Sequence, residues 1–188
     1  MSEFLKILLS IAISIVISVQ PANAARNTNS YDGNIFPIYA GNGSLVPPPV
    51  SISEALEAQR TSVIIYYLDD SSDSKSFAPV VSALKLIWGP SIDLIPLTTD
   101  SVQGNASSDP KEPSHYWHGM IPQIVVLNGS GEVFLDQEGQ VPLEKINEAI
   151  SKATGLEPPK DTFTIKSFNE YSSEPLKEGY LRPRQNIS

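Results

Sequence analysis

The apolar and polar positions of this chain follow two patterns, one typical of strands and one typical of helices. An apolar, β-branched and aromatic run over 62–68 predicts a buried central strand. After a polar tip, apolar residues at three- and four-residue spacings over 74–88 predict a helix that contains Pro79. A shorter helix with a capping box is expected before the strand, over 51–60. The chain is therefore organised around a strand, a tip and a helix.

The same patterns continue downstream. A second apolar strand is expected over 92–97, and Pro96 within it favours an edge position. The remaining expected elements are a polar loop at 98–114, a strand at 123–127, a hairpin turn at 128–131, a strand at 132–135 and a helix from Pro142 to Gly155. Strands that alternate with helices in this order are typical of an α/β domain.

The N-terminal segment 1–24 resembles an export signal. Residues 7–19 are apolar and uncharged, and Ala22-Asn23-Ala24 fits the small-x-small pattern of a cleavage site. A retained membrane anchor is the alternative, although an apolar run of about sixteen residues is shorter than the roughly twenty that a spanning helix needs. Both readings predict association with, or export across, a membrane.

The rest of the chain divides by composition. We expect a flexible lead-in at 25–50 with a short strand at Ile35–Tyr39, a compact domain at 51–156, and an extended tail at 157–188 with a short strand at 163–165.

Composition excludes several functions. The net charge is −8 without a long basic run, so nucleic acid is not an expected partner. The sequence has no cysteine, which excludes disulfides, thiolate metal sites and thiol redox chemistry within the chain. No bound cofactor or metal is expected.

The residues around the tip resemble the active-site segment of thioredoxins. That family reads Trp-Cys-Gly-Pro-Cys-Lys-x-x-Ala-Pro where this chain reads Asp70-Ser-Ser-Asp-Ser-Lys-Ser-Phe-Ala-Pro79. The lysine, alanine and helix-internal proline are kept, and Ile121-Pro122 before a strand resembles the family's cis-proline segment. The resemblance implies a thioredoxin-like three-layer α/β fold with a central mixed sheet of four to five strands flanked by helices.

The departures from the family decide the chemistry. Serine occupies both cysteine positions, Ser71 and Ser74, and Ile65 stands where the family has a buried carboxylate. Disulfide exchange needs a thiolate, so these changes remove both the nucleophiles and their proton acceptor. The degenerate motif positions Ser71, Ser72, Asp73 and Ser74 are therefore expected to be non-catalytic.

The resemblance also implies a binding groove. Met120, Ile121 and a cis Pro122 would lie beside the tip and could hold an extended segment of another protein without a covalent intermediate. The alternative is that this groove is vestigial.

A narrower group shares the leader, the acidity and the segments YYLDDSSDSK and PQIVVL. These are the thioredoxin-like thylakoid membrane proteins of cyanobacteria and plastids needed for photosystem I accumulation. The resemblance implies a thylakoid assembly factor whose partners are subunits of a membrane complex.

Two other functions stay open from the residues alone. One is an accessory of a thiol-redox chain that binds cysteine-bearing partners. The other is a metal-assisted hydrolase that uses the tip serines with Asp69, Asp70 and Asp73, or with a nearby His115 or His118. Loop aromatics that anchor to the domain are the simpler explanation of the two histidines and their neighbours Tyr116 and Trp117.

Overall fold

The structure is a computed structural model of the whole chain, and it describes residues 26–102, 104 and 106–158. The predicted signal or anchor, the strand at 163–165 and nearly all of the predicted tail lie outside these residues. Among the residues that are described, no helix is both long enough and apolar enough to cross a membrane.

A mixed sheet of four strands forms the centre of the domain. In spatial order it contains β2 (Asp93–Thr98), β1 (Ser62–Tyr67), β3 (Gln123–Leu127) and β4 (Val133–Glu138). Strand β1 runs parallel to β2 and antiparallel to β3, and β4 is antiparallel to β3. The predicted central strand and the edge position of Pro96 are confirmed, as is the mixed α/β sheet.

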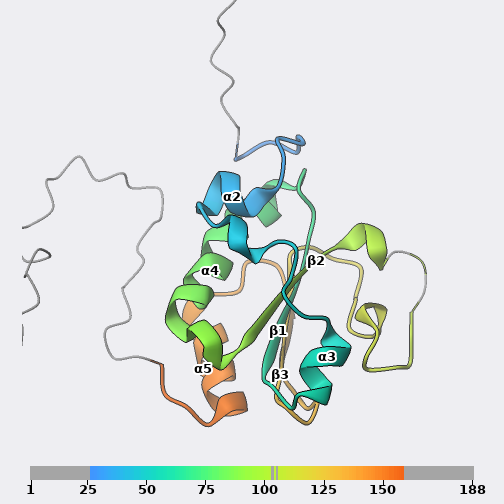
Figure 1. Cartoon of the computed structure of the whole chain (residues 1–188). Helices are drawn as coiled ribbons and strands as arrows, with labels where there is room; N and C mark the ends of the chain where they lie inside the picture. Colours follow the sequence, from blue (N-terminus) through green and yellow to red (C-terminus); the bar gives the residue numbers. More distant parts are fainter. Residues whose placement is uncertain (1–25, 103, 105, 159–188) are drawn as a thin grey trace, which may run out of the picture.

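Helices cover both faces of the sheet (Figure 1). The α-helices are α2 (Ile35–Ala40), α3 (Ile52–Glu57), α4 (Ser72–Trp88) and α5 (Leu143–Thr154). The short 3₁₀ segments are η1 (Gly43–Leu45), η2 (Gly89–Ser91), η3 (Thr99–Ser101) and η4 (Pro113–His115). Helices α4 and α5 lie on one side of the sheet and α3 on the other, which gives three layers.

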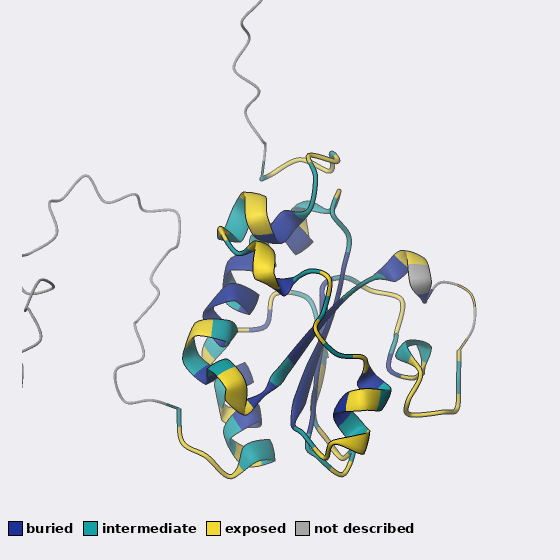
Figure 2. Ribbon diagram, viewed as in Figure 1, coloured by how far each residue is buried: buried dark blue, intermediate teal, exposed yellow. Residues whose placement is uncertain are grey.

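Alternate residues of the central strand fill two separate cores. Val63 and Ile65 pack with α2, α4 and α5, whereas Ile64 and Tyr66 pack with α3 and the loop that follows β2. All six residues of β1 are buried, and Figure 2 shows the inner strands dark against the exposed outer surfaces of the helices. Burying a large apolar side chain contributes about 1.5–3 kcal/mol, so this strand is a main source of stability.

The prediction of a flexible lead-in with a short strand is wrong. The segment Ile35–Ala40 is helix α2, capped by the Asn34 side chain at its start and by Gly41 in the left-handed region at its end. Ile35 and Phe36 are buried in the larger core. A six-residue apolar run has no clear periodicity, so its flanking Asn and Gly are the better indicators of helix here.

Candidate functional site

Ser71 and Ser74, the serines aligned with the thioredoxin cysteines, stabilise the backbone of the tip (residues 69–74). Ser71 is the N-cap of α4, and its Oγ accepts a hydrogen bond from the backbone N–H of Ser74 at 3.3 Å. The Ser74 side chain is 1% exposed, and its Oγ accepts a bond from the N–H of Leu68 at 3.2 Å. Both hydroxyl oxygens therefore act as acceptors that fix the backbone at the start of α4.

Ile65, at the position where thioredoxins have a buried carboxylate, is an apolar core residue. Ile65 is buried within the larger apolar core, between strand β2 and strand β3. The floor behind the tip is therefore apolar at this position.

Residues 26–34, which we call the strap, lie across the first two turns of α4. The ammonium group of the fully buried Lys75 donates to the carbonyl oxygens of Thr28 (3.0 Å) and Ser30 (2.6 Å) and to the carboxylate of Asp32 (2.7 Å). Burial by itself would lower the pKa of Lys75, but the bond to Asp32 outweighs it and the pKa is raised. The lysine therefore stays charged and fixes the strap.

The strap also occupies polar groups of the tip. The Asn29 side chain accepts a bond from the backbone N–H of Ser72 at 2.9 Å, at the start of α4. The Asp69 carboxylate accepts a bond from the N–H of Ile35 at 2.9 Å, and burial raises the pKa of Asp69. In the described part of the chain, no group of three or more His, Asp or Glu side chains is placed to hold a metal ion.

Residues 119–122, which we call the proline loop, lie at the same end of the sheet as the tip. The Ile121–Pro122 peptide is cis, which confirms that prediction, and the next residue pairs with the end of β1. The carbonyl oxygen of Pro122 accepts a bond from the N–H of Gly139, and the adjacent Gln140 side chain donates to the carbonyl oxygen of Asp73, both at 2.7 Å. The link between β4 and α5 thus joins the proline loop to the first turn of α4.

The side chains that face outward here suit recognition by contact. Met120 is 59% exposed, Ile121 is half-buried, and Pro122 is buried beneath them. On the tip, Ser71 and Ser72 are half-buried and Asp73 is exposed. The structure therefore brings the predicted motif and the proline loop to one end of the molecule. Their joint use as a groove stays a prediction.

Aromatic side chains anchor the loop that precedes the proline. The ring of Trp117 lies 5.3 Å from that of Tyr66, whose hydroxyl donates to the carbonyl oxygen of Pro113. Tyr116 is buried in the smaller core. His115 is exposed and bonds to the carbonyl oxygen of Ser107 at 3.0 Å, away from the tip serines. The aromatics therefore hold the loop in place, and the bonds that position the Ser71 and Ser74 hydroxyls come from backbone N–H groups.

Gln123 forms the centre of a polar network behind the proline loop. Its Oε1 accepts a bond from the backbone N–H of His118, and its Nε2 donates to the carbonyl oxygen of Tyr116 and to Asp136. The ring of His118 lies between Asp136 and Glu138, with Nε2 3.2 Å from one carboxylate and Nδ1 3.6 Å from the other. These contacts fix the loop immediately before Met120.

Sequence reasoning did not identify Lys75 and Gln123 as site residues. Lys75 was noted only as a residue that the thioredoxin motif also has, and the structure shows it buried beneath the strap. Gln123 is the one polar residue of an otherwise apolar strand, and this is a signal that could have indicated a buried hydrogen-bonding role.

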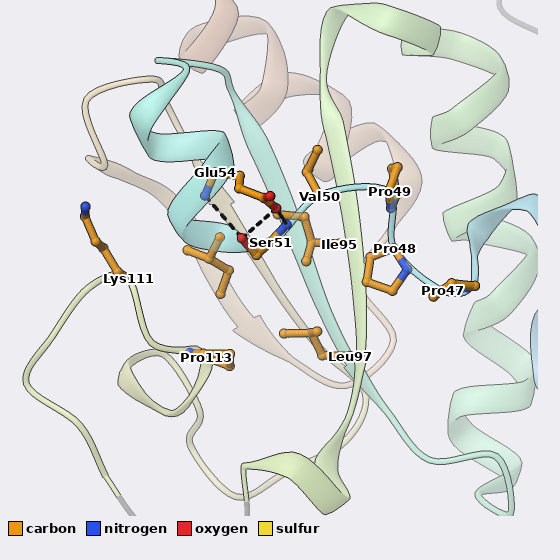
Figure 3. Close-up of a pocket in the computed structure, with 11 residues that line it drawn as sticks. Pro47, Pro48, Pro49, Val50, Ser51, Glu54, Ile95, Leu97, Lys111 and Pro113 are labelled. Carbon is orange, nitrogen blue, oxygen red and sulfur yellow. Dashed lines mark hydrogen bonds between the residues drawn. The ribbon is translucent and has the colours of Figure 1, made fainter.

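A separate apolar pocket of about 310 Å³ lies beside the β2 edge and the start of α3 (Figure 3). Its lining residues are Pro47, Pro48, Pro49, Val50, Ser51, Ile52, Glu54, Ile95, Leu97, Lys111 and Pro113. The charged groups at its rim have partners within the protein: Glu54 closes the Ser51 capping box, and Lys111 pairs with Glu57 at 2.8 Å. The pocket therefore presents an apolar floor without a free charge to select a ligand.

Comparisons with known proteins show what the chain is similar to. No family model matches the chain. A thylakoid membrane protein of Synechocystis is 37% identical over 155 residues, a match that covers 81% of this chain and 77% of that protein. Among solved structures, a mutant thioredoxin from Halobacterium salinarum is similar over 57% of this chain and 86% of its own, with 17% identity and a TM-score of 0.44.

Proposed function

Since the chain belongs to the family of the Synechocystis thylakoid membrane protein, we propose that it is a non-enzymatic binding factor of the thylakoid membrane. In this proposal, the tip and the proline loop form a groove that holds an extended segment of a partner protein. The partner is a subunit of a membrane complex, and the outcome is accumulation of photosystem I.

The observation that carries this proposal is that the hydroxyls of Ser71 and Ser74 both stabilise the local backbone. Ser71 caps α4 and Ser74 is buried beneath it, so both hydroxyls serve the local structure. Meanwhile Met120 is exposed at the adjacent loop. A site with a hydrogen-bonded backbone and an exposed apolar residue, in a sequence without cysteine, is suited to binding a partner without exchange of bonds.

Charge and hydrogen bonding support a rigid site. The network around Gln123 holds one side of the groove, and the strap held by Lys75 supports the other. A binding surface that is ordered before its partner arrives loses less conformational entropy on association. The protein can therefore capture a flexible segment without first rearranging.

A photocrosslinking experiment tests this proposal. A photoreactive amino acid replaces Met120 in the full-length chain in its own cells, and the crosslinked products are identified from solubilised thylakoid membranes. We expect photosystem I subunits, or proteins that assemble with them. The matched control places the same residue at Leu86, which is 70% exposed on α4 far along the helix from the tip.

The outcomes separate the candidate functions. Products at position 120 that are absent at position 86, and that belong to a membrane complex, support the proposal. A thiol oxidoreductase or its cysteine-bearing substrate as the specific product would favour the accessory of a redox chain. Identical products at both positions would reject the groove as a specific site.

A further inference from the structure

The ring of His118 has an unusual position between two acidic side chains of β4. Its Nε2 is 3.2 Å from Oδ2 of Asp136, and its Nδ1 is 3.6 Å from Oε1 of Glu138. A neutral imidazole has one N–H and one bare nitrogen, whereas the imidazolium ion has two N–H donors. Only the protonated ring can therefore offer a proton to both carboxylates.

This contact lies directly before the exposed part of the proline loop. Gly119, with φ at +91° in the region that favours glycine, separates His118 from Met120. The His118 N–H is fixed by Gln123, which itself donates to Asp136. The contacts that hold His118 to β4 thus lie two residues before the exposed Met120.

We propose that His118 is a positioning residue for the groove, and that its protonated ring fixes the loop carrying Met120 and Ile121 onto β4. The inference rests on the proposed function, because this loop forms one wall of the groove. It adds a regulation: the groove is best ordered when His118 carries a charge.

The groups that face His118 define the direction of the pH dependence. The charged groups are Asp136 and Glu138 on β4. Gln123 on β3 carries no charge. Tyr66 on β1 and Tyr116 in the loop stay neutral because burial raises the pKa of each hydroxyl. Histidine ordinarily changes charge between about pH 5 and 8, well above the range in which carboxylates do.

The charges of these groups determine whether the loop becomes more or less ordered as the pH rises. When the ring is protonated, it faces two carboxylates and the loop is held. As the pH rises, the ring loses its proton and a bare nitrogen faces a carboxylate oxygen. We therefore expect the loop to loosen with increasing pH.

Hydrogen exchange of the full-length protein without a partner tests this inference. Mass spectrometry follows the peptide that covers residues 117–122 between pH 5.5 and 8.0, with exchange expressed as protection relative to the unstructured rate at each pH. Partly exposed ion pairs contribute about 0.2–1 kcal/mol, so we expect protection to fall about 1.4- to fivefold across this range.

Three variants make the result specific. His118→Gln should remove the pH dependence, and Glu138→Gln should reduce it while leaving the histidine in place. His115→Gln should behave like the wild type, because His115 bonds to Ser107 away from β4. A flat wild-type profile, or an unchanged profile in His118→Gln, would overturn the inference.

The result is independent of the crosslinking experiment. Exchange is measured on the free protein, so a flat profile rejects the role of His118. It does not affect the conclusion drawn from crosslinks at position 120. Loss of specific crosslinks with an intact pH profile would instead reject the groove as the partner site.

Discussion

At the scale of single residues, the buried Lys75 connects two parts of the chain that the sequence keeps far apart. Its ammonium group replaces water with two backbone carbonyls and the Asp32 carboxylate of the strap. A buried charge is tolerated only when it is paired and hydrogen-bonded in this way. Removing the lysine would leave those acceptors without their donor.

We therefore expect Lys75→Met, which keeps the length of the side chain, to lower the melting temperature by about 5–10 °C. Lys85→Met, in the last turn of the same helix, is the matched control and should shift it by no more than about 2 °C. Thermal unfolding followed by circular dichroism measures both. Equal shifts in the two variants would contradict the role given to Lys75.

The same ion pair predicts an acid dependence. Hydrogen bonds from Lys75, and then from Tyr39, lower the pKa of Asp32 below its ordinary value. A carboxyl group whose pKa is lowered on folding stabilises the protein above its unfolded pKa, and this contribution is lost as the pH falls through the folded pKa.

The wild type should therefore lose more stability than Asp32→Asn when the pH falls from 5 to 3. Urea unfolding at several pH values measures the difference. Parallel curves for the two proteins would show that the ion pair does not contribute to stability in this range.

At the scale of elements, the start of α4 depends on its cap. Ser71→Ala removes the acceptor for the Ser74 N–H and should reduce the free energy of unfolding by about 1 kcal/mol. Ser72→Ala, one position into the helix, is the control and should change it by less than about 0.5 kcal/mol. A larger effect at Ser72 than at Ser71 in denaturant unfolding would refute the assignment of the cap.

The hairpin between β3 and β4 fits closely against the end of α3. A Cβ atom on Gly129 would lie 2.2 Å from the carbonyl oxygen of Gln59, so Gly129→Ala must displace backbone. We expect a loss of about 1–3 kcal/mol in the free energy of unfolding. At Gly43 the nearest atom would be 3.8 Å away, so Gly43→Ala is the control and should be nearly neutral.

The sequence predicted elements with strong periodicity and missed those held by polar contacts. Strand β1 and helix α4 were predictable because their apolar patterns are long. Helix α2 was not, because its six residues are too few to show a period. The strap was interpreted as part of a linker because bonds from Lys75 to backbone carbonyls cannot be recognised from the pattern of apolar residues.

At the scale of the whole molecule, the tip and the proline loop meet at one end of a rigid sheet. Their proximity was predictable only from the resemblance to thioredoxins, since nearly fifty residues separate Ser74 from Pro122 in sequence. The polar network at Gln123 and the contact of His118 with β4 became visible only in three dimensions. Pattern and resemblance thus indicated a candidate site, and the structure shows which contacts hold its residues.

The central claim is that this site binds a partner by shape and contact and uses no serine chemistry. Two variants separate these possibilities with little disturbance of the fold. Ser71→Asn removes the accessible hydroxyl while keeping a good N-cap. Met120→Glu places a charge on an exposed apolar residue of the groove, and Leu86→Glu is its control on α4.

The decisive measurement is the photosystem I content of thylakoids in cells that carry each variant as their only copy, at matched protein levels. We predict normal content with Ser71→Asn and Leu86→Glu and a clear loss with Met120→Glu. A loss with Ser71→Asn together with normal content in Met120→Glu would contradict the account.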